Sequence, residues 1–153
     1  MSEFLNLPLL NQRKDIADIT LKTLDQYHLS IDERDFLSRY QPENKLIIYG
    51  TLAPGKPNHH KISHIKGEWK PAILKGGNLE TKGWGADLGF NGFVQVSENK
   101  QTDIPCYVLF SEDLCRNWNF LDEFEGSGYK RILAIYELEN RQQGVGYLYA
   151  INE

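Results

Sequence analysis

Hydrophobic positions in the first 44 residues recur at helical spacing. From Ile16 to Tyr27 the apolar residues follow at three- and four-residue steps, the period of one face of an amphipathic helix. A second helix is predicted after Ser30, because Ser30 and Glu33 have the spacing of a capping box and apolar residues follow on one face. Pro42 ends this pattern. The sequence therefore predicts an N-terminal helical extension over residues 1–44.

From Lys45 onwards the pattern changes to strands. Lys45–Tyr49 is a short apolar run that ends at Gly50, as in a buried strand. Extended segments are also predicted at Glu68–Leu79, Phe93–Val96, Cys106–Phe110, Ile132–Leu138 and Val145–Ile151. Pro71 should lie at an edge or a bend, because it cannot donate to a strand ladder.

One helix is predicted among these strands, from Glu112 to Phe124, with Ser111 as its N-cap. Helices first, followed by strands with one inserted helix, favour an α+β fold built on a barrel or a strongly curved sheet. This second region spans residues 45–153.

Composition limits the class of protein. The 153 residues are 41% hydrophobic, enough for one globular core, and no apolar run approaches the ~18 residues of a membrane span. The N-terminus lacks the pattern of a signal peptide, and two cysteines, Cys106 and Cys115, form no disulfide framework. Both cysteines are expected to be core thiols. We expect a soluble, cytoplasmic protein without a membrane partner, whose oligomeric state the sequence leaves open.

The net charge of −4 argues against a nucleic-acid partner, but the charge is unevenly distributed. Residues 45–82 hold seven basic and two acidic side chains. These lysines either protect a sheet edge from aggregation or form a positive rim around a site for an anionic small molecule. Both interpretations stay open at this point.

Three acids end the predicted helix, and one of them points inward. At about 100° per residue, Glu125 falls within about 20–40° of the apolar positions Leu114, Trp118 and Leu121. Glu123 falls on the opposite side, and Asp122 on the shoulder. An inward carboxylate is costly unless it is paired or functional. It is either a structural ion pair with Lys130 or Arg131, or an acid or base whose pKa is raised by burial.

The segment after the first strand, Tyr49-Gly50-Thr51-Leu52-Ala53-Pro54-Gly55, has two readings. Gly50 permits a close approach to the backbone, and the following N–H groups are suited to an anion-binding nest. An ordinary exit from a strand is the alternative.

His59, His60 and His64 form a third candidate, a metal site, although they lie in a predicted loop without a nearby glutamate. Surface or hydrogen-bonding roles are the more frequent use of such histidines. No metal site is therefore predicted.

The glycine-containing loop after the first strand and the acidic segment at the end of the predicted helix together resemble motifs of the gamma-glutamyl cyclotransferase-like family. The resemblance is carried by Tyr49-Gly50-Thr51-Leu52-x-x-Gly55, Leu121-Asp122-x-x-Glu125-Gly126 and Tyr129-x-Arg131, and it covers about residues 45–150. Gly67-Glu68-Trp69-x-Pro71-Ala72 and Gly83-Trp84-Gly85-Ala86 resemble a bacterial branch of that family.

This resemblance implies a small mixed β-barrel with flanking helices and a pocket at one mouth. It implies that Glu125 is the general acid/base, and that Tyr49, Gly50, Thr51, Leu52 and Tyr129 bind the glutamyl part of a γ-glutamyl amine, amide or peptide. The products are 5-oxoproline and a free amine. The cyclisation is intramolecular, so it needs no metal or cofactor.

Two other classes of function remain as alternatives. The first is a non-catalytic module that binds a small ligand and docks a partner through the N-terminal helices. The second, weaker alternative is a metal-dependent hydrolase built on the three histidines.

Overall fold

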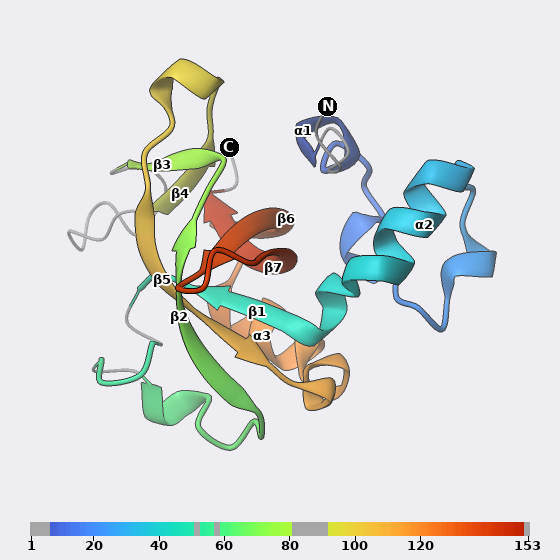
Figure 1. Ribbon diagram of the computed structural model, residues 1–153. Helices are drawn as coiled ribbons and strands as arrows, with labels where there is room; N and C mark the ends of the chain where they lie inside the picture. The colour runs from blue at the N-terminus through green and yellow to red at the C-terminus, as the bar shows by residue number, and fades with distance from the viewer. Residues whose placement is uncertain (1–6, 51–52, 57–58, 81–91, 152–153) are drawn as a thin grey trace.

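A closed barrel forms the centre of the protein (Figure 1). The computed structural model describes residues 7–50, 53–56, 59–80 and 92–151. Its strands are β1 (Lys45–Ile48), β2 (Glu68–Leu74), β3 (Gly77–Glu80), β4 (Gly92–Gln95), β5 (Ile104–Phe110), β6 (Tyr129–Leu138) and β7 (Gln143–Ile151). The order β1-β5-β2-β6-β7 closes on itself, because β1 also pairs with β7 in parallel at Leu46 and Tyr147. The other four pairings in the ring are antiparallel.

The remaining two strands extend the sheet beyond the ring. β4 pairs in parallel with β7 at Phe93 and Ala150, and β3 pairs with β4. Pro71 lies exposed in β2, which pairs with β5 along its length but with β6 only from Ala72. The missing N–H of Pro71 is therefore outside the β2–β6 ladder. The predicted α+β fold with a small mixed barrel is confirmed.

Alternation along the strands produces two apolar cores. In β1, Leu46 and Ile48 belong to a core that also contains residues of the N-terminal extension and the inserted helix, whereas Ile47 belongs to the other. Successive side chains of a strand point to opposite faces. The first core therefore lies between the outside of the barrel and its covering helices, and the second lies inside the barrel.

The N-terminal extension is less helical than its pattern predicted. It contains α1 (Leu7–Leu10), α2 (Ile31–Tyr40), and short 3₁₀ turns at Ile16–Asp18, Leu24–Gln26 and Pro42–Asn44. The capping box before α2 is confirmed, with both of its hydrogen bonds present.

The amphipathic helix expected from Ile16 to Tyr27 is wrong. Ile19 and Tyr27 are extended, and the N–H of Thr20 bonds to the Thr23 side chain in a turn. Ile16, Ile19 and Leu24 are nevertheless buried. The apolar spacing correctly predicted which side chains are buried, but not the backbone conformation, because an irregular chain can bury them as well as a helix can.

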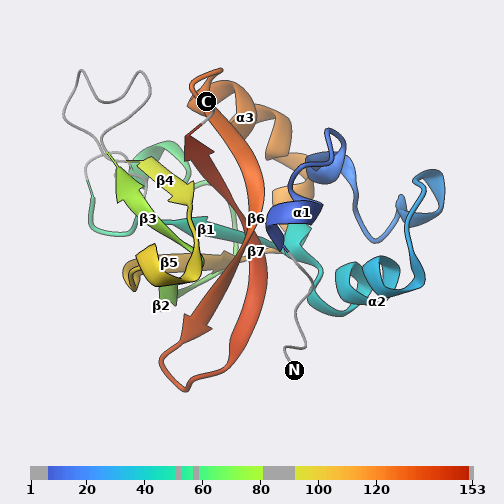
Figure 2. The same cartoon turned by 90° about the horizontal axis from the view of Figure 1, so that it is seen from above.

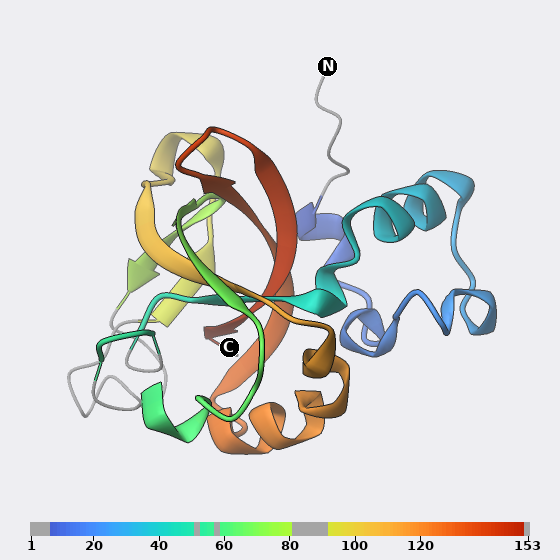
Figure 3. The same cartoon turned by 60° about the horizontal axis from the view of Figure 1, so that its bottom comes forward.

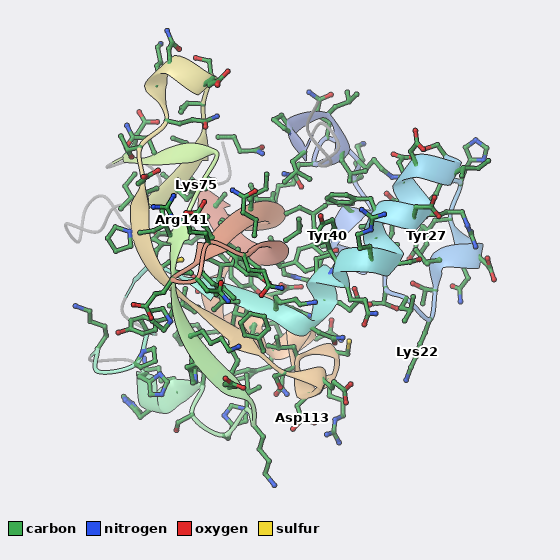
Figure 4. The ribbon with its side chains drawn as sticks, viewed as in Figure 1. Lys22, Tyr27, Tyr40, Lys75, Asp113 and Arg141 are labelled. Carbon is green, nitrogen blue, oxygen red and sulfur yellow. The ribbon has the colours of Figure 1, made fainter. Side chains whose placement is uncertain are left out.

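The extension lies against one side of β6 and β7, opposite β3 and β4 (Figure 2). The buried Asn11 side chain donates to the carbonyl of Leu133 and accepts from its N–H, at 2.9 and 2.8 Å. Its amide therefore completes the hydrogen bonds of β6 at a position that β2 does not reach. The Tyr147 hydroxyl donates to the carbonyl of Ile16 at 2.8 Å. Figure 4 shows Tyr40 between α2 and the barrel, whereas Lys22 points away from it.

The inserted helix is divided in two. Ser111 caps a 3₁₀ helix, Glu112–Arg116, and α3 (Trp118–Glu125) follows after Asn117. The single helix predicted from Glu112 to Phe124 is therefore wrong in its continuity, and it ends one residue later. Gly126, at φ 78°, ends α3 in a conformation that favours glycine. No helix in the described part of the chain is long and apolar enough to cross a membrane.

Candidate active site

Two segments meet at one end of the barrel (Figure 3). The chain after β1 runs beside α3, where the His64 ring contacts Phe120 edge-on and the Lys61 ammonium lies 5.2 Å from the Phe124 ring centroid. The 3₁₀ helix His59–Lys61 belongs to this segment. The segment around His59–His64 and the acidic end of α3 are therefore neighbours in space, although about sixty residues separate them in the sequence.

The three acids at the end of α3 have different surroundings. Glu123 is exposed. The Asp122 carboxylate accepts from Arg131 at both oxygens, 2.9 Å from Nε and 3.2 Å from Nη2, and from the Tyr149 hydroxyl at 2.6 Å. Glu125 is partly buried, and its carboxyl group has no hydrogen bond or ion pair to any residue that the structure describes.

Burial without a partner changes the acidity of Glu125. Loss of hydration raises its pKa to about 7, from an ordinary value near 4.5. Arg131 pairs with Asp122, and within the described residues Lys130 donates only to the carbonyl of Asn11, at 3.5 Å. The structural ion pair that we considered for Glu125 is therefore contradicted in the described chain. A carboxyl group with a pKa near neutrality can both accept and donate a proton at physiological pH.

Three tyrosines lie within electrostatic range of this carboxyl group. Burial first, and the Glu125 charge in addition, raises the pKa of Tyr49, Tyr129 and Tyr149. The Tyr49 hydroxyl donates to the carbonyl of Tyr149 at 2.6 Å and accepts from the N–H of Phe93 at 2.9 Å. Tyr49 therefore fixes the end of β1 to β4 and β7, next to Glu125.

The backbone after Tyr49 is partly described. A Cβ added to Gly50 would meet no heavy atom within 4 Å, so open space lies beside its Cα. The N–H of Ala53 closes a turn onto the carbonyl of Gly50 at 3.1 Å, and Gly55 has φ 80°. Thr51 and Leu52, which we named as substrate-binding residues, lie outside the described residues, as do residues 83–86 of the second glycine-rich motif.

The histidines and cysteines make no common site. His59 packs edge-on against Trp69, and His60 is exposed. In the described ranges no three His, Cys, Asp or Glu side chains group as a metal site would require. Cys106 is buried as predicted, but Cys115 is exposed, which corrects the expectation of a core thiol.

A cavity of about 150 Å³ borders Asp122 where the extension meets the barrel. It is lined by Lys14, Ile16, Ala17, Asp122, Tyr129, Lys130, Arg131 and Tyr149. Tyr129 therefore borders both this cavity and the surroundings of Glu125.

Sequence reasoning missed the contacts that Asp122 makes with Arg131 and Tyr149. The helical angle placed Asp122 on the shoulder of α3 and gave no partner for it. Arg131 and Tyr149 lie opposite each other on neighbouring strands, and this follows only from the register of the β6–β7 pair. A long-range pairing of this kind leaves no periodic signal in the sequence.

The comparisons with known proteins agree with this fold. The model of the family "Gamma-glutamyl cyclotransferase, AIG2-like" matches residues 46–153, and the chain therefore belongs to this family. A search of curated proteins gave no match.

Three solved structures resemble the chain at 17–23% identity. At this identity, the two with TM-scores of 0.50 and 0.53 show the fold alone. YkqA of Bacillus subtilis is 23% identical with a TM-score of 0.53, and the match covers 71% of this chain and 36% of YkqA. At3g28950.1 of Arabidopsis thaliana is 17% identical with a TM-score of 0.50, over 71% of this chain and 61% of that one. An AIG2-like protein of Mus musculus is 21% identical with a TM-score of 0.49, over 70% and 76%. The chain thus spans less than two thirds of the first two proteins.

Proposed function

We propose that the protein is a gamma-glutamyl cyclotransferase. It converts a small γ-glutamyl amine, amide or peptide to 5-oxoproline and a free amine, with Glu125 as the general acid/base. Membership of the family supports the reaction class. The observation that carries the proposal is the partly buried, unpaired carboxyl of Glu125, whose pKa lies near 7, among acids that are paired or exposed.

The reaction needs only groups that the substrate and one carboxylate provide. Glu125 removes a proton from the α-ammonium of the glutamyl group, and the free amine attacks the γ-carbonyl carbon. Glu125 returns this proton to the leaving nitrogen as the bond between that nitrogen and the carbon breaks. The attacking nitrogen loses its second proton by way of Glu125 to the departing amine, which leaves as an ammonium ion. One carboxylate therefore acts as base and then as acid, and no net proton is consumed.

The protein's second task is to hold the substrate folded. A γ-glutamyl chain must bend until its own amine reaches the γ-carbonyl, and fixing that geometry supplies a large part of the rate. The open space beside Gly50 supports a role for this backbone in approaching the glutamyl group closely. By resemblance, the amides of Gly50, Thr51 and Leu52 hold the carboxylate or the developing oxyanion.

The direct test is a screen of γ-glutamyl amines, amides and dipeptides for 5-oxoproline release. We expect release from at least one compound, and the same rate after treatment with a chelator, because no step uses a Lewis acid. Binding of a γ-glutamyl compound without turnover would contradict the enzyme proposal and favour the non-catalytic binding module. Activity that disappears with the chelator and returns with zinc would contradict the mechanism.

A further inference from the structure

Arg131 is a cation enclosed by the protein. Its side chain is 6% exposed, and its guanidinium carbon lies 4.3 Å from the Trp118 ring centroid and 5.0 Å from that of Tyr147. Nη1 is buried without a hydrogen-bond partner in the described chain. A buried cation is tolerated when a carboxylate balances it, and here that carboxylate is Asp122.

Asp122 also joins three elements of the fold. It belongs to α3, its ion-pair partner Arg131 belongs to β6, and the Tyr149 hydroxyl that it binds belongs to β7. α3 packs on these strands through its apolar side, and the contacts of Asp122 are the polar ones that fix its last turn. Glu125 lies one helical turn further on, immediately before the end of α3 at Gly126.

The same strand end connects the two carboxylates. The Tyr149 hydroxyl lies within electrostatic range of Asp122, Arg131 and Glu125, and all three charges affect its pKa. The carbonyl of Tyr149 accepts from Tyr49. The main chain and side chain of Tyr149 therefore link the Asp122 pair to the surroundings of Glu125.

We infer that Asp122 is a positioning residue for Glu125. Its contacts with Arg131 and Tyr149 hold the last turn of α3 in place, and its charge keeps the Arg131 cation balanced beside the site. This inference rests on the proposed role of Glu125, and nothing in the family match assigns it. Asp122 itself does not touch the reacting atoms.

The charge part of the inference has a defined direction. Without Asp122 the Arg131 cation is unbalanced, and an unbalanced positive charge favours the ionised form of a nearby carboxyl. Among the residues that the structure describes, the other ionisable groups near Glu125 are three tyrosines and a lysine above the neighbouring Phe124: Tyr49, Tyr129, Tyr149 and Lys61. Tyrosines are neutral at pH 7, so the charged groups to consider in this part of the described chain are Asp122, Arg131 and Lys61.

Two variants separate the positioning effect of the Asp122 contacts from the effect of the Asp122 charge. Asp122→Asn removes the charge and keeps the shape, so we expect kcat to fall roughly tenfold to hundredfold with a small change in KM. The acidic limb of its pH–rate profile should also move down by roughly half a unit to one unit. Tyr149→Phe removes one hydrogen bond and keeps the ion pair. We expect it to lower kcat less, with an unmoved profile.

Glu123→Gln is the matched control, because it removes the same charge from an exposed position of the same helix. It should leave kcat and the profile unchanged. If Asp122→Asn does not fold, Tyr149→Phe decides alone, and an unchanged kcat there overturns the inference. An Asp122→Asn protein that folds and keeps the wild-type kcat and profile also overturns it.

One readout does not depend on turnover. The carboxyl carbon of Glu125 can be titrated by NMR in the wild type and in Asp122→Asn. The inference expects a lower midpoint in the variant, and an identical midpoint contradicts it. Absence of 5-oxoproline release from the wild type would refute the proposed function and leave this measurement to judge the role of Asp122.

Discussion

Asp122 and Glu125 are three residues apart on α3, and each faces a different part of the molecule. Asp122 lies on the side where the extension meets the barrel, and it lines a cavity with Ile16 and Ala17. Its oxygens accept hydrogen bonds from Arg131 and Tyr149. Glu125 lies on the side of Tyr49 and receives no such bond within the described residues.

This difference between the two carboxyl groups suits Asp122 to stabilising the fold and Glu125 to exchanging protons. A carboxylate that is paired and hydrogen-bonded contributes to the folded state but is not free to exchange protons with a substrate. A carboxyl that is buried without partners costs stability when it ionises, and it gains a pKa near neutrality. Removing one of these side chains should therefore destabilise the protein, and removing the other should stabilise it.

On the side of the molecule that Asp122 faces, we expect the largest loss of stability when the extension is removed. A chain that starts at Pro42 loses the covering side chains Ile16, Ile19, Leu24 and Phe36, each of which is buried. Each contributes about 1.5–3 kcal/mol through burial, so their sum reaches the usual stability of a whole domain. We expect this chain to be unfolded or aggregated, measured by circular dichroism and by sedimentation.

A shortened chain with the wild-type unfolding midpoint would show that the extension covers nothing essential. A shortened chain that stays folded but loses all turnover would instead place part of the active site in the extension. We propose that residues 1–44 cover the barrel and carry no chemistry, and either result would contradict this.

Asp122→Asn should lower the free energy of unfolding by about 1–3 kcal/mol. The variant leaves Arg131 buried without a counter-charge, but Asp122 is 41% exposed, so the loss is smaller than for a fully buried pair. Urea unfolding at pH 7 measures the change. Glu123→Gln is the control and should be within about 0.5 kcal/mol of the wild type.

Glu125→Gln should have the opposite sign and a dependence on pH. The folded-state pKa of Glu125 is raised to about 7, so the folded protein holds this proton more tightly than the unfolded chain does. Stability from this group is complete below the unfolded pKa near 4.5 and is lost as the pH rises through 7. The amide of glutamine does not ionise.

The variant should therefore match the wild type near pH 4.5 and exceed it by about 1–3 kcal/mol at pH 8. Urea unfolding at several pH values between these limits measures the difference. A constant difference across this range would mean that Glu125 has an ordinary pKa in the folded protein.

The barrel was predictable from sequence because its strands carry dense apolar runs between glycines and prolines. β1, β5 and β7 fall within a few residues of the predicted segments. The structure of the extension was not predictable from the sequence, because apolar residues three and four positions apart occur both in a helix and in an irregular chain that buries Ile16 and Ile19. Its fixed points, Asn11 on Leu133 and Tyr147 on Ile16, join residues more than a hundred positions apart.

The candidate site was predictable in part for a similar reason. Helical angle alone distinguished Glu125 from the exposed Glu123, because α3 is regular up to Gly126. It could not assign Arg131 to Asp122, since that pairing depends on where β6 and β7 begin. The roles given to Thr51 and Leu52 remain predictions, and the function of Glu125 awaits measurement.

The most direct test compares 5-oxoproline release by the wild type, Glu125→Gln and Glu123→Gln on one γ-glutamyl substrate found by the screen. Glutamine keeps the size of the side chain but cannot transfer a proton. We predict that Glu125→Gln loses roughly 10²–10⁴ in kcat, the usual contribution of a general acid/base, while its fold and substrate binding persist. Glu123→Gln should keep the wild-type rate. A Glu125→Gln protein that turns over at the wild-type rate would contradict the account.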